Sequence, residues 1–266
     1  MDERSHDQDL TTWYDAPENT PIDSDRRRRY MSMRESCGYL SWQTSRMEYE
    51  FAPGITADEY ADRLRQGWRR FGTSLFRPRC PSCAACQSLR VDVARFRPDR
   101  SQRRVRHANE GVVETRVGQP GLSREKLLLY HRYHAHQCVA KGWPSHDDVD
   151  PASYFGSFVL NPFPTEEWCY FIEGKMVGVG YVDALSVGLS AIYFFHDPDH
   201  REHSLGTWNV LCLIETCRKL GLPHLYLGYY VKECGSLAYK ARFAPNQVLS
   251  AQGRWVEHDT GRPFKA

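Results

Sequence analysis

Alternation of apolar and polar residues predicts two strands and one helix in the first third of the chain. Residues 47–51 alternate apolar and acidic side chains, which is typical of a half-buried strand. Thr56 is followed three residues later by Glu59, a capping box that starts a helix, and apolar residues then recur at four-residue spacing until Gly72 ends it. Residues 88–96 alternate again and predict a second strand.

The second half of the chain shows a more regular order of elements. Apolar residues at helical spacing predict a helix over residues 123–141, which Gly142 follows. Strand patterns cover residues 168–172, 176–185 and 190–196, and a tight turn at 173–175 joins the first two. A second helix runs from about residue 206 to 220 and is followed by a strand at 225–231.

Strand, hairpin, strand, glycine-containing loop, amphipathic helix and strand is an order that resembles the core of the GNAT acyltransferase fold. We therefore expect an α+β protein, with a GNAT-like fold in the C-terminal half and a smaller, cysteine-containing α/β domain before it. The expected boundaries are a flexible arm at 1–25, a cysteine-rich and basic domain at 26–115, the GNAT-like domain at 120–255 and a tail at 256–266.

Composition fits an ordered protein of this size. The chain has 266 residues, enough for one large or two small domains, and its 13% aromatic residues argue against disorder. The start of the sequence is charged, and no apolar stretch is long enough to cross a membrane. We therefore expect a cytoplasmic protein without a membrane partner, whose nine cysteines are reduced.

Four of the cysteines suggest a metal or cluster site. Cys80, Cys83 and Cys86 follow one another at two-residue gaps, and Cys37 is available as a fourth thiolate. Four thiolates suit an iron–sulfur cluster or zinc on spacing alone, and a metal-free group of reduced thiols is the third alternative. The other cysteines are scattered singly and are expected to be small core residues.

Positive charge is concentrated next to these cysteines. Residues 77–106 contain nine arginines and two acidic residues, although the formal net charge of the whole chain is only +2. Such a segment is suited to nucleic-acid phosphates, with a solvated basic face as the alternative. The candidate phosphate-binding residues are Arg77, Arg79, Arg97, Arg100, Arg103, Arg104 and Arg106. Ser204 and Gly206, in the loop before the second helix, are further candidates because backbone N–H groups at a helix start bind phosphate.

Several motifs together resemble the bacterial branch of the aminoacyl-tRNA–protein transferase family, which includes eukaryotic arginyltransferases and bacterial aspartate/glutamate leucyltransferases. They occur in the family's order over roughly residues 30 to 250. One departure follows Leu40, where bacterial relatives commonly have a proline. The motifs comprise Cys37 to Leu40, Leu75 to Cys86, Arg95 to Arg104, Asp197 with Pro198, Ser204 to Thr207, Leu225 to Tyr230 and Ala238 to Phe243.

The resemblance implies a reaction and its partners. A member of this family moves an amino acid from charged tRNA to the N-terminal amine of a protein and thereby marks that protein for degradation. Leucyl-tRNA is favoured over arginyl-tRNA as donor, and proteins beginning with Asp or Glu are the implied acceptors. The ester of charged tRNA is already activated, so the transfer requires no cofactor. Iron–sulfur binding by eukaryotic relatives implies the same role for Cys37, Cys80, Cys83 and Cys86.

The fold analogy places the chemistry near residues 194–197 and 227–230. Asp197 is a candidate to orient the attacking amine or accept its proton, with an ordinary turn as the alternative. Tyr229 or Tyr230 is a candidate hydroxyl for the ester, and the other is expected in the core. Lys240 and Arg242 are candidates to bind the acidic side chain of the acceptor. No single side chain decides between a leucyl and an arginyl donor.

Two other functions are consistent with parts of the sequence. An acyl-CoA-dependent GNAT N-acyltransferase explains the second half of the chain but neither the cysteines nor the arginines. A non-catalytic tRNA-binding protein, with a zinc-ribbon module joined to a degenerate acyltransferase domain, explains the first half. Neither accounts for the ordered motifs across both halves.

Overall fold

The described part of the computed structural model comprises residues 27–143 and 150–258. Its largest element is a mixed eight-stranded sheet in the order β14-β13-β7-β12-β11-β10-β9-β8. The strands of this sheet are β7 (Gln87–Asp92), β8 (Glu114–Gly118), β9 (Glu166–Ile172), β10 (Lys175–Leu185), β11 (Gly188–His196), β12 (His224–Tyr230), β13 (Asn246–Leu249) and β14 (Trp255–Glu257).

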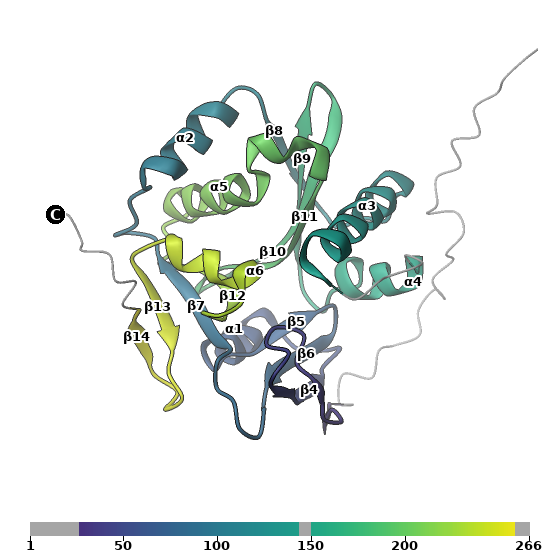
Figure 1. Cartoon of the computed structure of the whole chain (residues 1–266), viewed down its shortest axis with the longest axis vertical. Coiled ribbons are helices and arrows are strands. Elements are labelled where there is room, and N and C mark those ends of the chain that lie inside the picture. The colour runs from purple at the N-terminus through teal and green to yellow at the C-terminus, as the bar shows by residue number, and fades with distance from the viewer. Residues whose placement is uncertain (1–26, 144–149, 259–266) are drawn as a thin grey trace, which may run out of the picture.

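Helices cover both faces of this sheet (Figure 1). On one face, α5 (Leu205–Lys219) packs against β11 and β12, and α2 (Arg100–Asn109) packs on α5. Their apolar side chains form the largest core cluster, which contains Leu213, Ile214 and Leu225. On the other face lie α3 (Arg124–Lys141), the short α4 (Pro151–Tyr154) and a π-helical turn (Phe155–Val159), whose aromatic side chains pack against β9, β10 and β11.

A smaller antiparallel sheet lies at the lower end of Figure 1. Its strand order is β1-β4-β6-β5. Strands β2 and β3, which lie between β1 and β4 in the sequence, form a separate two-stranded sheet. Helix α1 (Ala57–Arg65) contributes Tyr60, Ala61 and Leu64 to a core that also contains residues of β10 and β12. The strands are β1 (Arg28–Met31), β2 (Glu35–Ser36), β3 (Thr44–Ser45), β4 (Met47–Phe51), β5 (Arg69–Phe71) and β6 (Ser74–Pro78).

Most predicted elements are confirmed. The strand at 47–51 is β4, the helix at 123–141 is α3 with Ser123 as its N-cap and Gly142 as its left-handed C-cap, and the later strands agree within a few residues. The capping box of Thr56 and Glu59 is present. The predicted end of that helix at Gly72 is wrong, because α1 ends at Arg65 and Gly67 adopts a φ of 86°.

Other elements differ from the prediction. The strand at 88–96 is shorter, since β7 ends at Asp92, whose carboxylate accepts the Arg95 N–H in a turn. Helix α2 was not predicted, although Asp99 and Gln102 form a capping box at its start. Strands β7 and β8 precede residue 120, where the GNAT-like domain was expected to begin, but they belong to the same eight-stranded sheet as its strands. Residues 256 and 257 of the expected tail belong to β14, and the expected arm at 1–25 lies outside the described residues.

None of the helices within residues 27–143 and 150–258 combines the length and the apolar character that crossing a bilayer requires.

Candidate active site

The centre of the large sheet contains two parallel strands that separate. Strands β11 and β12 pair only at Leu189 with Leu225 and at Ser190 with Tyr226. Both strands continue beyond these pairs, to His196 and Tyr230. A cavity of about 480 Å³ lies beside the separated ends, lined by residues of β11, β12, α3, the start of α5 and the short helices after β12. Backbone groups at such a split are available to a ligand because no neighbouring strand pairs with them.

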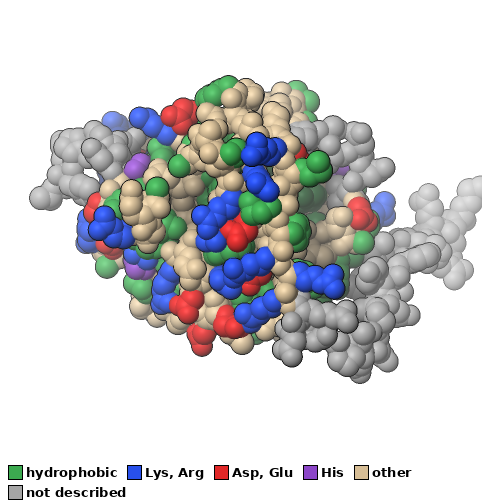
Figure 2. Space-filling model, turned by 90° about the horizontal axis from the view of Figure 1, so that it is seen from below, with side chains coloured by type: hydrophobic (Ala, Val, Ile, Leu, Met, Phe, Trp, Pro, Cys, Tyr) green, Lys and Arg blue, Asp and Glu red, His purple; other side chains and the backbone are tan. Residues whose placement is uncertain are grey.

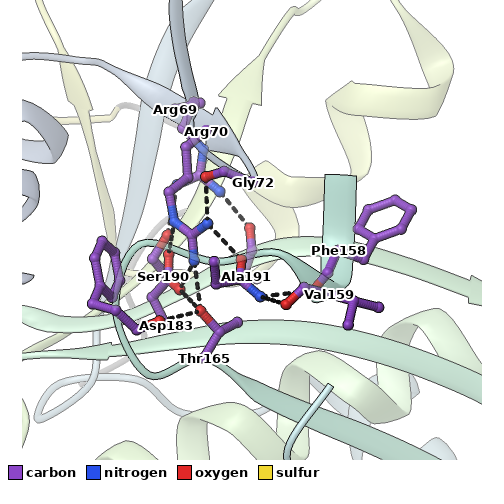
Figure 3. Close-up of polar contacts among 11 residues, drawn as sticks. Arg69, Arg70, Gly72, Phe158, Val159, Thr165, Asp183, Ser190 and Ala191 are labelled. Atoms are coloured by element: carbon purple, nitrogen blue, oxygen red, sulfur yellow. Dashed lines mark hydrogen bonds and ion pairs between the residues drawn. The ribbon is translucent and has the colours of Figure 1, made fainter. Parts of the chain in front are cut away.

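Arg69 of β5 lies at the beginning of this split (Figure 3). Its guanidinium donates to the Ser190 hydroxyl over 3.2 Å and to the Ala191 carbonyl. Gly228 of β12 has a φ of 77°, and a Cβ at that position would lie 3.4 Å from Arg69 Nε. Arg69 therefore occupies the space between the strands and supplies hydrogen bonds that a paired strand would otherwise make.

Arg70, the next residue, forms a buried polar network that fixes β5 against β10 (Figure 3). Both side chains of the Arg70–Asp183 ion pair are fully buried. Arg70 also donates to Thr165 Oγ1 over 2.7 Å, Asn161 Oδ1 over 2.8 Å and the Gly72 carbonyl over 2.8 Å. These partners satisfy the guanidinium away from water, so the network gives the split strands a rigid support.

The loop before α5 supplies a second wall of the cavity. Ser204 adopts the left-handed conformation, with a φ of 48°, and Ser204 and Gly206 both line the cavity together with Arg201. The first N–H groups of a helix have no partner within the helix, and the helix dipole favours an anion there. The structure therefore brings the predicted pair Ser204 and Gly206 to a position suited to phosphate.

Lys240 and Arg242 line the same cavity from the short helix Tyr239–Arg242. Lys240 is half-buried and its Nζ donates to the Tyr229 carbonyl over 2.8 Å. Burial, and then the nearby Arg69 guanidinium, lower the pKa of Lys240 to about 7. Arg242 is exposed and donates to Ser101 at the start of α2.

The charged side chains of the cavity are all positive among the described residues. Its cationic side chains are Lys141, Arg201, Lys240 and Arg242, and none of the described residues that line it is Asp or Glu. Apolar side chains, among them Ile192, Leu227 and Phe243, form the rest of the wall together with aromatic and neutral polar residues. This composition suits an apolar group together with anionic groups.

The structure does not bring Asp197 to this cavity. Its fully buried carboxylate accepts from Lys175 over 2.9 Å and from both terminal nitrogens of Arg132 over 2.9 and 3.2 Å. Burial alone would raise the pKa of Asp197, but Lys175, the Asp199 N–H and Arg132 outweigh it, and the pKa is lowered. Asp197 thus connects α3 and β10 to the end of β11 as an ionised, fully paired carboxylate.

The side chains of Tyr229 and Tyr230 also lie outside the 480 Å³ cavity. Tyr229 donates its hydroxyl to the carbonyls of Gly67 and Phe76 and faces a second cavity. Tyr230 lies in the core on the opposite face of the sheet and packs against His258. Only the Tyr229 backbone, through its bond to Lys240, contacts the candidate site.

The candidate phosphate-binding arginines lie in three places. Arg77 and Arg79 both pair with Glu48 of the four-stranded sheet. Figure 2, which views the molecule from below, shows Lys and Arg side chains interspersed with acidic ones on that face. Arg97 donates to backbone carbonyls before α2. The remaining four lie on α2 and are exposed: Arg100, Arg103, Arg104 and Arg106. Of these, Arg106 pairs with Glu110.

Helix α2 contacts the cavity at Gln102, and none of its arginines lines the cavity. Gln102 of α2 lines the cavity and donates to the Arg242 carbonyl over 3.1 Å. Arg100 and Arg104 make no ion pair or side-chain hydrogen bond with the described residues, so their guanidiniums are available to a ligand. The structure thus joins a basic helix to the cavity, which the sequence pattern alone did not show.

The four predicted cysteine ligands surround the second cavity, of about 700 Å³, near the four-stranded sheet. Cys37, Cys80, Cys83 and Cys86 all line it. Among the described residues, however, no three Cys, His, Asp or Glu side chains form a group that could hold a metal ion. The iron–sulfur or zinc site at these four cysteines stays a prediction.

Comparisons with known proteins cover both halves of the chain. The family described as "Arginine-tRNA-protein transferase, N terminus" matches residues 35–104, and the family described as "Arginine-tRNA-protein transferase, C terminus" matches residues 125–250. An aspartate/glutamate leucyltransferase of Campylobacter jejuni (strain 81-176) is 36% identical over 86% of this chain and 96% of its own length. One from Halorhodospira halophila is 36% identical over 82% of this chain and 92% of its own length.

Solved structures are less similar. L-PGS from Bacillus licheniformis shares 16% identity, with a TM-score of 0.39 over 55% of this chain and 47% of that chain, which is too low to assign a common fold.

The sheet is split beside a cationic cavity, and transferase sequences match both halves of the chain. The protein is therefore a transferase. More particularly, the chain belongs to the aminoacyl-tRNA–protein transferase family. The family matches span both the cysteine segment and the second half of the chain, so they do not support the acyl-CoA enzyme or the non-catalytic tRNA-binding protein.

Proposed function

We propose that this enzyme transfers leucine from leucyl-tRNA to the N-terminal amine of proteins that begin with Asp or Glu. The observation that carries the proposal is the apolar part of the wall of the 480 Å³ cavity, which includes Ile192, Leu227 and Phe243. A leucyl side chain fits such a wall because it needs no polar partner, whereas burying an arginyl side chain against it is costly. The relatives' name, aspartate/glutamate leucyltransferase, supports the same assignment.

The acceptor's acidic side chain also fits the charge of the cavity. Lys141 and Arg201 are exposed cations on its wall and can bind a carboxylate. Arg242 is also exposed but lies 3.6 Å from the Asp99 carboxylate, which the acceptor's carboxylate would replace. A new N-terminal leucine on the product would mark it for degradation, as the family resemblance implies. Transfer in the cytoplasm, with soluble protein acceptors, is part of this proposal.

The chemistry requires removal of one proton from the attacking amine. The amine nitrogen attacks the ester carbonyl carbon, a C–N bond forms, and the bond from that carbon to the ribose oxygen of tRNA breaks. We assign Lys240 as the group that accepts the amine's proton, which then passes to the departing ribose oxygen. Its lowered pKa and its position on the cavity wall support this role better than the paired carboxylate of Asp197.

A GNAT-like fold is also part of the proposal. Parallel β11 and β12 that pair at two positions, and the start of α5 beside the split, support it. The expected pyrophosphate position at Ser204 and Gly206 then receives a phosphate of the tRNA 3′ end.

Helix α2 is proposed to bind the tRNA backbone near its charged end. Changing Arg100 and Arg104 together to alanine is expected to weaken tRNA binding and to reduce the slope of log K against log salt by about 1–2, about one for each phosphate that is no longer bound. Filter binding at several salt concentrations measures both. Arg65→Ala, on α1 and paired with Asp62, is the control and should leave the slope unchanged. Equal slopes for the double variant and the wild type would contradict the role of α2.

The donor and acceptor are tested by a transfer assay with radiolabelled leucyl- or arginyl-tRNA and peptides that begin with Asp, Glu, Lys or Ala. We expect label from leucyl-tRNA on the Asp and Glu peptides only. Label from arginyl-tRNA on the same peptides would reverse the donor assignment. Equal labelling of the Lys and Ala peptides would contradict the acceptor assignment.

A further inference from the structure

Gln137 is a buried amide on the cavity wall that has no role in the proton transfer assigned to Lys240. It lies on α3 and lines the 480 Å³ cavity, and only 5% of the residue is exposed. Its Oε1 is buried without a hydrogen-bond partner among the described residues. Leaving a buried amide oxygen unpaired is costly, so such groups in native proteins usually have a bound partner. A ligand that donates a hydrogen bond would satisfy Gln137.

The surroundings of Gln137 indicate which donor fits. Tyr133, one turn earlier on α3, lies with its ring 6.1 Å from that of Trp143 and 5.3 Å from that of His196. All three rings line the cavity. An amide oxygen accepts a hydrogen bond, and the cationic side chains of the cavity disfavour a second positive charge, so the donor that fits is a neutral amino group. Lys141, one turn after Gln137, is the nearest cation along the helix, but it is exposed and its ammonium can extend into water.

Two amino groups enter this cavity during the reaction, and the structure separates their positions. The acceptor's amine must lose a proton and is assigned to Lys240, on the segment that packs against β12. Gln137 approaches from α3, which packs against β10 and β11. The donor's α-amino group takes no part in bond formation but is attached to the carbon beside the ester. A hydrogen bond to that group would orient the ester for attack.

We propose that Gln137 binds the α-amino group of the aminoacyl ester, so that the cavity selects donors whose α-amino group is present and free. The proposal rests on the transferase function proposed for the same cavity and assigns Gln137 as the residue that recognises the donor's α-amino group. Esters that lack this group leave Gln137 unpaired and are bound in more than one orientation.

The test compares leucyl-tRNA with 4-methylpentanoyl-tRNA, which has the same side chain but hydrogen in place of the amino group. Wild-type enzyme is expected to use leucyl-tRNA with a kcat/KM at least tenfold higher. Gln137→Leu, which keeps the size of the side chain but cannot hydrogen-bond, is expected to lower kcat/KM for leucyl-tRNA at least tenfold. The same change should leave the deaminated donor within about twofold of its wild-type value.

Two results would overturn the proposal. One is equal use of both donors by the wild type, a comparison that needs no variant and therefore stands even if Gln137→Leu does not fold. The other is an equal loss for both donors in Gln137→Leu, which would indicate a merely structural role. If the wild type transfers only from arginyl-tRNA, the leucyl assignment falls, and the same comparison with arginyl-tRNA and its deaminated counterpart still tests Gln137.

Discussion

Changing Lys240 to methionine is expected to lower kcat for aminoacyl transfer by about 10²–10⁴-fold, the usual contribution of a positioned proton acceptor. Lys240 lines the cavity and is held by the Tyr229 carbonyl. Burial lowers its pKa first and the Arg69 guanidinium second, while the Cys234 and Cys86 thiols act in the opposite direction, leaving a pKa of about 7. A neutral amine is therefore available near neutral pH, and single-turnover kinetics with saturating charged tRNA measures the effect of removing it.

The pH dependence of kcat/KM shows whether Lys240 acts in its neutral form. Below pH 7 Lys240 is protonated and cannot accept a proton, so kcat/KM is expected to rise with pH and level off above about pH 8. A lysine with an ordinary pKa would place this rise near pH 10.4. The acceptor's own amine titrates near pH 7.7–8.0, so the profile is compared with that of Lys240→Arg, in which only the acceptor titrates in this range.

Lys240→Arg also separates the two roles considered for this residue. Arginine keeps the positive charge but stays protonated, so it can bind an acidic acceptor side chain and cannot accept a proton. Loss of activity in both variants supports proton transfer. Activity retained by Lys240→Arg and lost by Lys240→Met would contradict it and would support acceptor binding instead.

Changing Asp183 to alanine is expected to destabilise the protein by about 3–5 kcal/mol, because it leaves the Arg70 guanidinium buried without its charge partner. A typical domain is stable by only about 5–15 kcal/mol, so the variant should be largely unfolded at moderate urea concentrations. Thr165, Asn161 and the Gly72 carbonyl still accept hydrogen bonds from Arg70, but none carries a charge. Urea unfolding followed by circular dichroism measures the change.

The matched control is an exposed ion pair. Asp62 and Arg65 are three residues apart on α1, and their side chains are 68% and 50% exposed. Asp62→Ala is expected to change stability by less than about 1 kcal/mol. Equal urea midpoints for Asp183→Ala and Asp62→Ala would show that the Arg70 network does not support the fold.

Catalytic roles were harder to predict from the sequence than binding groups. Ser204, Gly206, Lys240 and Arg242 do line one cavity, because short motifs near helix starts and strand ends place them there. Asp197 had an equally suitable position in the sequence, at the end of a strand. Its partners, however, are Arg132, 65 residues earlier, and Lys175, 22 residues earlier, and no local pattern shows that these three meet.

Residues of the cavity that the sequence did not indicate come from distant elements. Gln137 and Tyr133 lie on a helix whose polar and aromatic positions are typical of any packed helix. Arg69, at the strand split beside the cavity, lies 121 residues before Ser190, to which it donates. Arg69 and Arg70 stand between Trp68 and Phe71 in a stretch that also contains Arg65, Gln66 and Thr73, so nothing local shows that both guanidiniums are buried.

The sequence by itself determined the local elements and the family. The capped start of α1, the whole of α3 from Ser123 to Gly142 and the hairpin at 173–174 depend on hydrogen bonds and periodicities that span a few residues. Only the tertiary structure decided the site. The split between β11 and β12, the insertion of β7 beside β12 and the lowered pKa of Lys240 depend on contacts between residues far apart in the chain. Burial and charge, which set that pKa, are properties of the assembled fold and not of any segment.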